Sequence, residues 1–292
     1  MIRTIVTHDE VFHTDEIFAV AYLLLCFPEA KVIRTRNIKS EWTNDKTVAL
    51  VDVHEKGVPN HTAYNCGLNN FDHHMDYPLT NGRSAFGLVV DFYNHKHPSS
   101  YIYKLYGQET GEFVFNNFKE HLVNAIDKWD TGEIQTKDVD ENIIPIQLAF
   151  RWMNQDLINS ESQYHSFMVA VNHAQNFIRG ALSSAYRVKE AIGIWENRNT
   201  ITCNNKKDAI VSFSDFCMVW IKENSKLENP YPIAIFPQDE ETYVVKSYDS
   251  NKWPLKLHEA NDLKFFHPHN FIAKYRTFDS ALKCAKLSLE DS

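Results

Sequence analysis

Near the start of the chain stand IRTIVTH (residues 2–8) and EIFAVAYLLLCF (residues 16–27), separated by a short polar stretch. The first is a run of apolar and β-branched residues, which predicts a buried strand. The second is almost wholly apolar, as in a helix that packs on a sheet, and Pro28 ends it. KVIRTR (residues 31–36) and TVALVDV (residues 47–53) predict further strands. The order strand, helix, strand, strand predicts an open α/β fold with a mostly parallel sheet.

Three regions are predicted along the chain. Residues 1–144 form an N-terminal domain built on the open sheet. Residues 145–198 carry apolar side chains at three- and four-residue spacing, which predicts a helical connector. In residues 199–292 the β-branched runs return, and a helical pattern at residues 278–289 follows them. We therefore predict a smaller C-terminal α/β domain, which would bind substrate.

Composition limits the kind of protein this can be. The 292 residues carry a formal net charge of −8, without the basic footprint of proteins that bind long nucleic-acid duplexes. The five cysteines form no C-x-x-C pair, which argues against a disulfide framework and a thiolate zinc site. We find no secretory leader pattern and no apolar run long enough to span a membrane. A cytoplasmic globular protein without membrane contact is therefore expected.

Polar side chains follow two of the predicted strands. His8 comes directly after the first strand, and Asp52 stands at the end of the third. Ligands of open α/β sheets bind beyond the carboxyl ends of the strands, so these side chains are candidates for a site there. His13 and Asp15 follow in the first loop. Asp15 also lies near the start of the predicted helix, where a helix cap is its alternative role.

A second candidate segment is Asp72-His73-His74. Neighbouring side chains on a strand point to opposite faces, so two adjacent histidines serve one site when they lie on a loop. The flanking Asn69, Asn70, Asp76 and Pro78 favour a loop. An ordinary solvated polar loop is the alternative interpretation of this segment.

A third candidate segment is AIDKWDTG, at the end of a helical pattern over residues 115–128. Asp127 and Asp130 are three residues apart, so they share one face of a helix end. Gly132 breaks the helix behind them. A solvated helix end is the alternative interpretation.

Together, the three segments supply imidazole and carboxylate groups without cysteine. This mixture suits Mn²⁺, Fe²⁺, Co²⁺ or Zn²⁺ better than a structural thiolate zinc site. The segments offer more ligands than one ion needs. A carboxylate such as Asp52 can bridge two ions, and two ions about 3.5–4 Å apart can activate water and stabilise the leaving oxygen of a phosphoester. The sequence therefore predicts two-metal phosphoester chemistry.

The order of these residues resembles the motif series of the DHH phosphoesterase superfamily, and more closely that of the MYG family of metal-dependent hydrolases. The opening motif resembles TH-x-x-x-FH-x-DE, which stands here at residues 7–16. FDHH (71–74) is followed by NGRSAFGLV (81–89), similar to the segment after the DHH of the family. The likeness continues through AFRWMNQD, FMVAVNHAQNFI and FFHPHNFIAKYRTFDSALKCAKLSL, so it extends over nearly the whole chain.

The resemblance implies a role for each candidate residue. The ligands implied for one ion are His8, His13 and Asp52. Those implied for the other are Asp15, Asp52, His73 and Asp130, with Asp127 as the alternative or supporting aspartate. His74 would face the phosphate and take part in catalysis. In the C-terminal domain, His267 falls where the family has a histidine, and Arg276 is a nearby cation that could hold phosphate. From its charge alone, Arg83 is a further candidate for a local substrate contact.

The resemblance further implies a 3′ to 5′ exonuclease that acts on RNA or short single-stranded oligonucleotides. It would use two divalent ions, Mn²⁺ first, with Mg²⁺, Co²⁺ or Zn²⁺ as alternatives. A pyrophosphatase, a cyclic-dinucleotide hydrolase or another small-phosphoester hydrolase would use the same ions on a different substrate. A non-catalytic metal- or nucleotide-binding protein is the third interpretation, because Val53-His54 stands where the family has a glycine pair. A homo-oligomer is compatible with the sequence.

Overall fold

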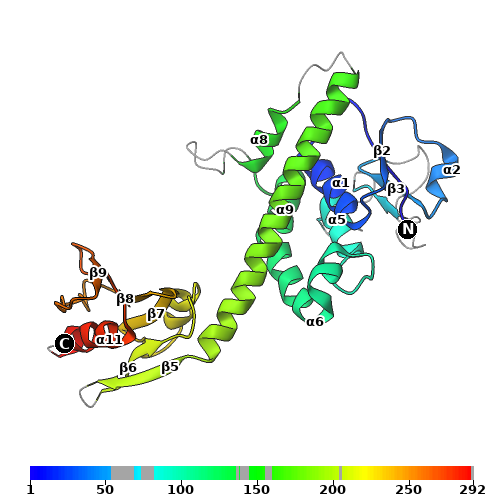
Figure 1. The fold of residues 1–292 in the computed structure, drawn as a ribbon. Coiled ribbons are helices and arrows are strands. Elements are labelled where there is room, and N and C mark those ends of the chain that lie inside the picture. Colours follow the sequence, from blue (N-terminus) through cyan, green and yellow to red (C-terminus); the bar gives the residue numbers. More distant parts are fainter. Residues whose placement is uncertain are drawn as a thin grey trace. The chain divides into compact units, whose positions relative to one another are not determined.

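The computed structural model describes residues 1–53, 69–73, 82–135, 138, 145–154, 160–203 and 206–290. It divides into two compact units, Met1–Tyr186 and Arg187–Ser292, which are described separately (Figure 1). The division falls inside helix α9 (Ser160–Glu196), within the region 145–198 that the sequence predicts as a connector. The chain has an α/β fold with one parallel and one mixed sheet, as predicted.

The first unit is built on a four-stranded parallel sheet. Its strands are β1 (Thr4–Thr7), β2 (Lys31–Arg34), β3 (Val48–Val51) and β4 (Asn69–Phe71). They pair in the order β2-β1-β3-β4, which confirms the predicted open sheet. Because β2 and β3 lie on opposite sides of β1, the direction of winding reverses between β1 and β3. In open α/β sheets, ligands bind at such a reversal.

Strand β4 corrects part of one prediction. Asn69 and Asn70, which favour a loop in the sequence, are buried in β4, whereas Asp72 and His73 follow the strand outside regular secondary structure, as predicted. His74, Asp76 and Pro78 lie outside the described residues. The Asn69 amide group donates to the Lys46 carbonyl (3.0 Å), and its oxygen accepts a hydrogen bond from the Tyr93 hydroxyl (2.7 Å). Since buried polar groups are tolerated when they are hydrogen-bonded, asparagine can occupy this strand.

Helices connect the strands of the first unit. They are α1 (Thr14–Cys26), α2 (Ser40–Thr43), α5 (Ala85–Phe92), α6 (Tyr101–Phe118), the π-helical turn η1 (Lys119–Val123), α7 (Asn124–Asp130), α8 (Ile146–Arg151) and most of α9. α1 is buried along nearly its whole length, as its apolar sequence predicts. The helical region before Asp130 begins at Tyr101 rather than at residue 115, because Gly107 (φ 68°) interrupts the helical periodicity.

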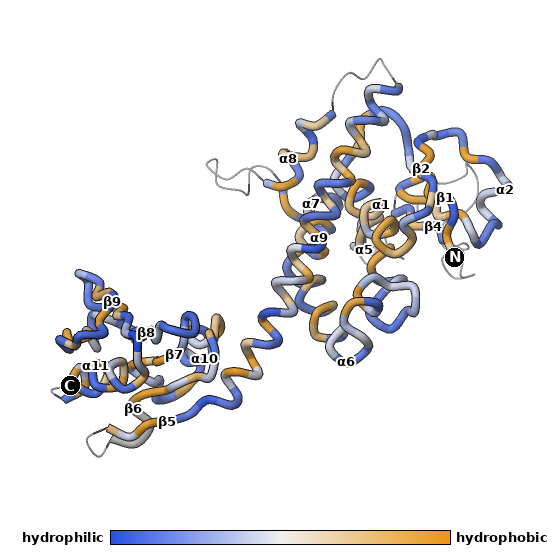
Figure 2. Tube along the Cα trace, viewed as in Figure 1, coloured by the Kyte–Doolittle hydropathy of each residue, from blue (hydrophilic) through white to orange (hydrophobic). Residues whose placement is uncertain are grey.

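Helix α9 presents one apolar face. Hydrophobic and hydrophilic residues alternate along its length (Figure 2), as in a helix that is buried on one side. Its buried apolar side chains in the first unit are Phe167, Ala170, Val171, Ala174, Ile178, Leu182 and Ala185. Their three- and four-residue spacing confirms the predicted helical pattern. Within the described stretches, no helix has both the length and the apolar character needed to cross a membrane.

The second unit is built on a six-stranded mixed sheet with strand order β5-β6-β7-β8-β10-β9. Its strands are β5 (Asn199–Cys203), β6 (Lys206–Ser212), β7 (Ile233–Asp239), β8 (Thr242–Ser247), β9 (Leu263–Phe266) and β10 (Ile272–Tyr275). Its helices are α10 (Trp220–Asn224) and α11 (Phe278–Leu289), and α11 confirms the predicted helix at 278–289. The sequence does not predict β9 (LKFF) and β10 (IAKY), because neither carries the run of β-branched residues that marks the predicted strands.

Candidate metal centre

The carboxyl ends of the parallel strands bring the candidate residues together. His8 follows β1, Asp52 follows β3, and His73 lies two residues after β4. Asp15 lies in the first turn of α1, and Asp130 is the last residue of α7. The candidate site is therefore at the reversal of winding between β1 and β3, where ligands of such sheets bind.

Two groups of side chains in the described part of the chain could each hold a metal ion. The first group is His8, His13, Glu16 and Asp52, and the second is Asp15, His73 and Asp130. Within each group, one nitrogen or oxygen atom per residue lies within 4.8 Å of the others. Three or four such donors are what one transition-metal ion usually takes from a protein. The predicted ligands thus divide between two neighbouring positions.

Asp52 lies between the two groups. Its Oδ2 is 3.3 Å from His8 Nε2, and its Oδ1 is 3.5 Å from His73 Nε2. Its backbone is in the left-handed region (φ 55°), which few residues other than glycine adopt, although aspartate is one of them. The Asp52 amide donates to the Phe71 carbonyl (3.1 Å), which ties it to the end of β4. This uncommon backbone conformation turns one carboxylate oxygen toward each group, as a bridging ligand requires.

The carboxylate of Asp15 indicates that a cation belongs in the second group. The residue is 1% exposed, and neither oxygen makes a hydrogen bond of good geometry to the described part of the chain. Burial raises the pKa of Asp15 well above its ordinary value, and the charges of Asp52 and Asp130 raise it further. A buried carboxylate is costly unless hydrogen bonds or a cation compensate it. A divalent ion therefore fits this group.

Glu16 is a member of the first group that the sequence interpretation does not include. Its side chain is fully buried, forms an ion pair with His8 Nε2, and lies 3.9 Å from His13 Nδ1. Burial raises the pKa of Glu16 to about 7, although His8 opposes the rise. Burial alone would lower the pKa of His8, but its hydrogen bonds with Asp52 and Glu16 raise it to about 10. A carboxylate at the start of an otherwise apolar helix becomes buried with that helix, and this signal is present in EIFAVAYLLLCF.

The loop that carries His8 and His13 is held from two sides. Arg34, whose side chain is 5% exposed, donates from Nε to the His8 carbonyl (3.1 Å) and from its terminal NH2 group to the Glu10 carbonyl (2.9 Å). Asn154 accepts a hydrogen bond from the Phe12 amide and donates to the Phe12 carbonyl, both at 2.9 Å. These contacts bind backbone groups of the loop, so they hold the loop in place without using the ring nitrogens of His8 or His13.

Asp127 belongs to neither of the groups found among the described residues. Its Oδ1 accepts hydrogen bonds from the Ser84 amide (3.0 Å) and hydroxyl (2.7 Å), and its Oδ2 accepts one from Arg83 (2.6 Å). The Arg83 guanidinium also pairs with Asp91 (3.0 Å). These contacts join α7 to the start of α5 and so support Asp130 at the end of α7. A phosphate contact for Arg83 stays a prediction.

Gly87 leaves room for these contacts of Asp127. A Cβ at Gly87 would collide with both Asp127 carboxylate oxygens and with Arg83. We predict that Gly87→Ala lowers the free energy of unfolding by about 1–3 kcal/mol, because the crowded carboxylate must leave its partners. Gly180→Ala in α9 is the control, since a Cβ there meets nothing within 4 Å. Urea denaturation measures both variants, and equal stability of the two would contradict this role of Asp127.

The structure does not place three of the predicted site residues at either of the two groups. His74 lies outside the described residues. His267 and Arg276 belong to the second unit, where His267 Nδ1 accepts a hydrogen bond from the His269 amide (3.1 Å) and Arg276 is exposed. Substrate contacts for these three residues therefore stay predictions.

Comparison with known proteins identifies the family to which the chain belongs. The MYG1 protein of Chlamydia muridarum (strain MoPn / Nigg) is 28% identical over 138 residues, which are 47% of this chain and 40% of that protein. The match thus spans less than half of that relative's length. A crystal structure of an uncharacterized protein from Helicobacter pylori G27 has 9% identity and a TM-score of 0.22 with 99% of each chain covered, a likeness that carries no inference. The family model MYG1_exonuc, described as an uncharacterised protein family (UPF0160), matches residues 4–257. The chain therefore belongs to the MYG1_exonuc family.

Proposed function

We propose that the chain is a two-metal phosphoesterase that removes nucleotides from the 3′ end of RNA or short single-stranded oligonucleotides. The family and the buried groups of His, Asp and Glu together indicate a metal-dependent hydrolase. The observation that carries the proposal is the position of Asp52, whose carboxylate oxygens lie 3.3 Å from His8 Nε2 and 3.5 Å from His73 Nε2. A carboxylate placed in this way can be shared by two ions, as in enzymes that cleave phosphoesters.

The donor atoms fit two divalent ions. Those that would hold the first ion come from His8, His13, Glu16 and Asp52. Those that would hold the second come from Asp15, Asp52, His73 and Asp130. Mixed imidazole and carboxylate donors suit Mn²⁺, Co²⁺ or Zn²⁺, and we place Mn²⁺ first. When bound, such ions supply the Lewis-acid charge that activates water and stabilises a leaving oxygen.

The burial of the metal-group residues determines from which side substrate can reach the centre. Glu16 and Asp52 are almost wholly buried, whereas the His13 side chain is 58% exposed and that of Asp130 is 20% exposed. Substrate therefore reaches the centre from the side of His13 and Asp130. We assign His74 to the phosphate, which is the role that the resemblance to the MYG family implies for it. An imidazole there would stabilise charge that develops on the phosphate oxygens.

The net charge favours small, single-stranded substrates. The chain carries a formal charge of −8, so it lacks the broad positive surface that grips a long duplex. Affinity would come from the metal centre and from a few local contacts. A short single strand can bring its terminal phosphoester to such a centre, whereas the end of a blunt duplex must first unpair.

A labelled oligonucleotide tests this proposal. The Mn²⁺-loaded protein is expected to shorten a 5′-labelled single-stranded RNA stepwise from its 3′ end and to release mononucleotides. Blunt duplex should be cleaved at least about tenfold more slowly, because unpairing a terminal base costs a few kcal/mol. Denaturing gels resolve the ladder. Internal cuts, or equal rates on both substrates, would overturn the exonuclease and favour pyrophosphate or cyclic-dinucleotide hydrolysis. Failure to turn over any of these substrates would favour a binding protein.

A further inference from the structure

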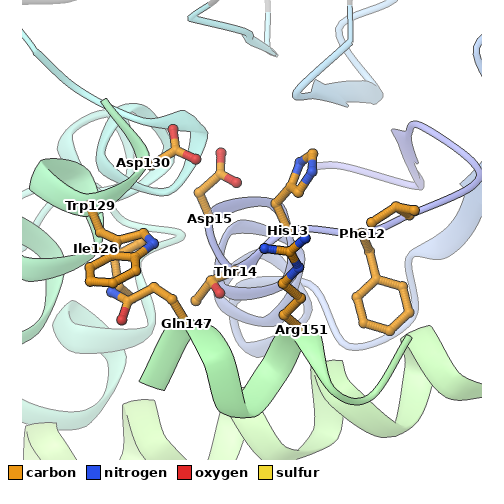
Figure 3. Close-up of a pocket in the computed structure, with 10 residues that line it drawn as sticks. Phe12, His13, Thr14, Asp15, Ile126, Trp129, Asp130, Gln147 and Arg151 are labelled. Carbon is orange, nitrogen blue, oxygen red and sulfur yellow. The ribbon is translucent and has the colours of Figure 1, made fainter. Parts of the chain in front are cut away.

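A pocket of about 340 Å³ lies against the exposed side of the metal centre (Figure 3). Its volume is at the lower end of the range for small-molecule sites. One wall is formed by members of the metal groups, namely His13, Asp15 and Asp130. Other polar or aromatic residues that line the pocket are Trp129 from α7, and Gln147 and Arg151 from α8. The pocket thus joins the metal centre to residues that play no part in it.

Arg151 supplies a cation at the edge of the metal centre. Figure 3 shows its side chain rising from α8 toward His13, and both residues line the pocket. The residue is exposed, and no carboxylate among the described residues forms an ion pair with it. A guanidinium recognises phosphate through paired hydrogen bonds and keeps its charge at any ordinary pH. Its position next to His13 therefore suits a phosphate that also faces the metal centre.

Trp129 supplies an aromatic surface on the other side of the pocket. In Figure 3 its indole lies with Gln147 across from Arg151, below the paired carboxylates of Asp15 and Asp130. It is half-buried, and no aromatic ring of the described residues stacks on it. Indole rings stack on nucleobases of any sequence. The Gln147 amide can donate to and accept from the edge of a base.

We propose that this pocket binds the terminal nucleotide of the substrate, with its phosphate between Arg151 and the metal centre and its base against Trp129. The inference rests on the proposed function, since it names the residues that would hold the nucleotide to be released. A nucleoside 5′-monophosphate is then the smallest complete ligand of the pocket. Adenosine and inorganic phosphate each represent one half of that ligand.

Calorimetric titration of the Mn²⁺-loaded full chain tests the pocket with adenosine 5′-monophosphate, adenosine and inorganic phosphate. Arg151→Ala is expected to weaken binding of the monophosphate and of phosphate about tenfold or more, and to leave adenosine unchanged. Trp129→Ala should weaken the monophosphate and adenosine about tenfold and leave phosphate unchanged. Arg151→Lys and Trp129→Phe should each restore part of the affinity, because they keep the charge or the ring.

Matched controls come from the same unit. Arg179→Ala and Trp152→Ala each remove an exposed side chain that does not line the pocket, and both should bind all three ligands like the wild type. Thermal denaturation checks that every variant is folded. In turnover assays, the two pocket variants should raise KM about tenfold with little change in kcat, since they hold the substrate rather than the metals.

The outcomes test the pocket independently of the proposed exonuclease activity. Selective loss of phosphate affinity in Arg151→Ala and of adenosine affinity in Trp129→Ala supports the pocket, even if no phosphoester is hydrolysed. Wild-type affinities and KM in both folded variants overturn the pocket, even if the wild type degrades RNA. Equal weakening of all three ligands by either variant also overturns it, because a general disturbance of the metal centre would act in that way.

Discussion

Asp52→Asn is expected to lower turnover by roughly 10²–10⁴-fold and to remove at least one of two bound ions. The carboxylate faces both metal groups, so the loss of its charge weakens both positions at once. Asparagine keeps the size of the side chain and accepts the left-handed backbone at this position (φ 55°), so the fold should survive. Turnover on a short RNA and elemental analysis of the protein measure the two effects.

A neighbouring acid provides the control for this variant. The Asp9 side chain is 48% exposed and lies in the same loop as His8, and its Oδ1 is 3.7 Å from Arg36 Nε. Asp9→Asn should therefore keep wild-type turnover and metal content. Asp52→Ala should behave like Asp52→Asn, since both lack the bridging charge. Wild-type turnover in either Asp52 variant would rule out the bridge.

Loading with Mn²⁺ is expected to place two ions in each chain and to raise the melting temperature by roughly 5–10 °C over chelator-treated protein at saturating metal. The large expected shift follows from the buried carboxylate of Asp15, which is costly without a cation. Elemental analysis gives the stoichiometry, and differential scanning calorimetry gives the melting temperature. Metal content at background after loading would contradict the two-ion centre.

Asp15→Asn separates the two positions. It removes a buried carboxylate whose oxygens lack a well-aligned hydrogen bond among the described residues. Without metal, this variant should therefore melt higher than the wild type. With Mn²⁺ it should hold one ion and gain less stability, because the first group does not include Asp15. A second ion retained in this variant would show that Asp15 is not a ligand.

Local sequence signals explain which parts of the fold can be predicted. β1 and α1 stand out because apolar runs of suitable length report burial directly. Strand β4 is hidden because Asn69 and Asn70 resemble loop residues, and only the contacts of Asn69 with distant partners make burial acceptable. β9 and β10 are hidden because LKFF and IAKY carry no run of β-branched residues, and their place as strands depends on pairing within the sheet.

In the candidate site, too, residues marked by local sequence signals can be predicted, and residues that depend on distant contacts cannot. His8 and Asp52 can be proposed from sequence, because the carboxyl ends of parallel strands meet at one edge of a sheet. Glu16 is harder to propose, because its membership of the first group depends on which way the first turn of α1 faces. Asp130 belongs to the second group and Asp127 to neither of the described groups, and the choice of Asp130 as ligand stays a prediction. The contacts of Asp127 with Arg83 and Ser84 join residues more than 40 positions apart, which no local sequence signal reveals.

The hydrogen-bonded pair of Phe12 and Asn154 joins residues that are 142 positions apart. Protein synthesis adds about 5–20 residues per second, so a growing chain carries the first histidines for on the order of ten seconds before Asn154 exists. During that time His8, His13 and Glu16 are present without one of the two residues that hold their loop. An ion captured early would meet an incomplete set of donors on a flexible nascent chain. An ion at the first group would therefore find its full set of donors in place only late in synthesis, after residues that do not belong to the group have been made.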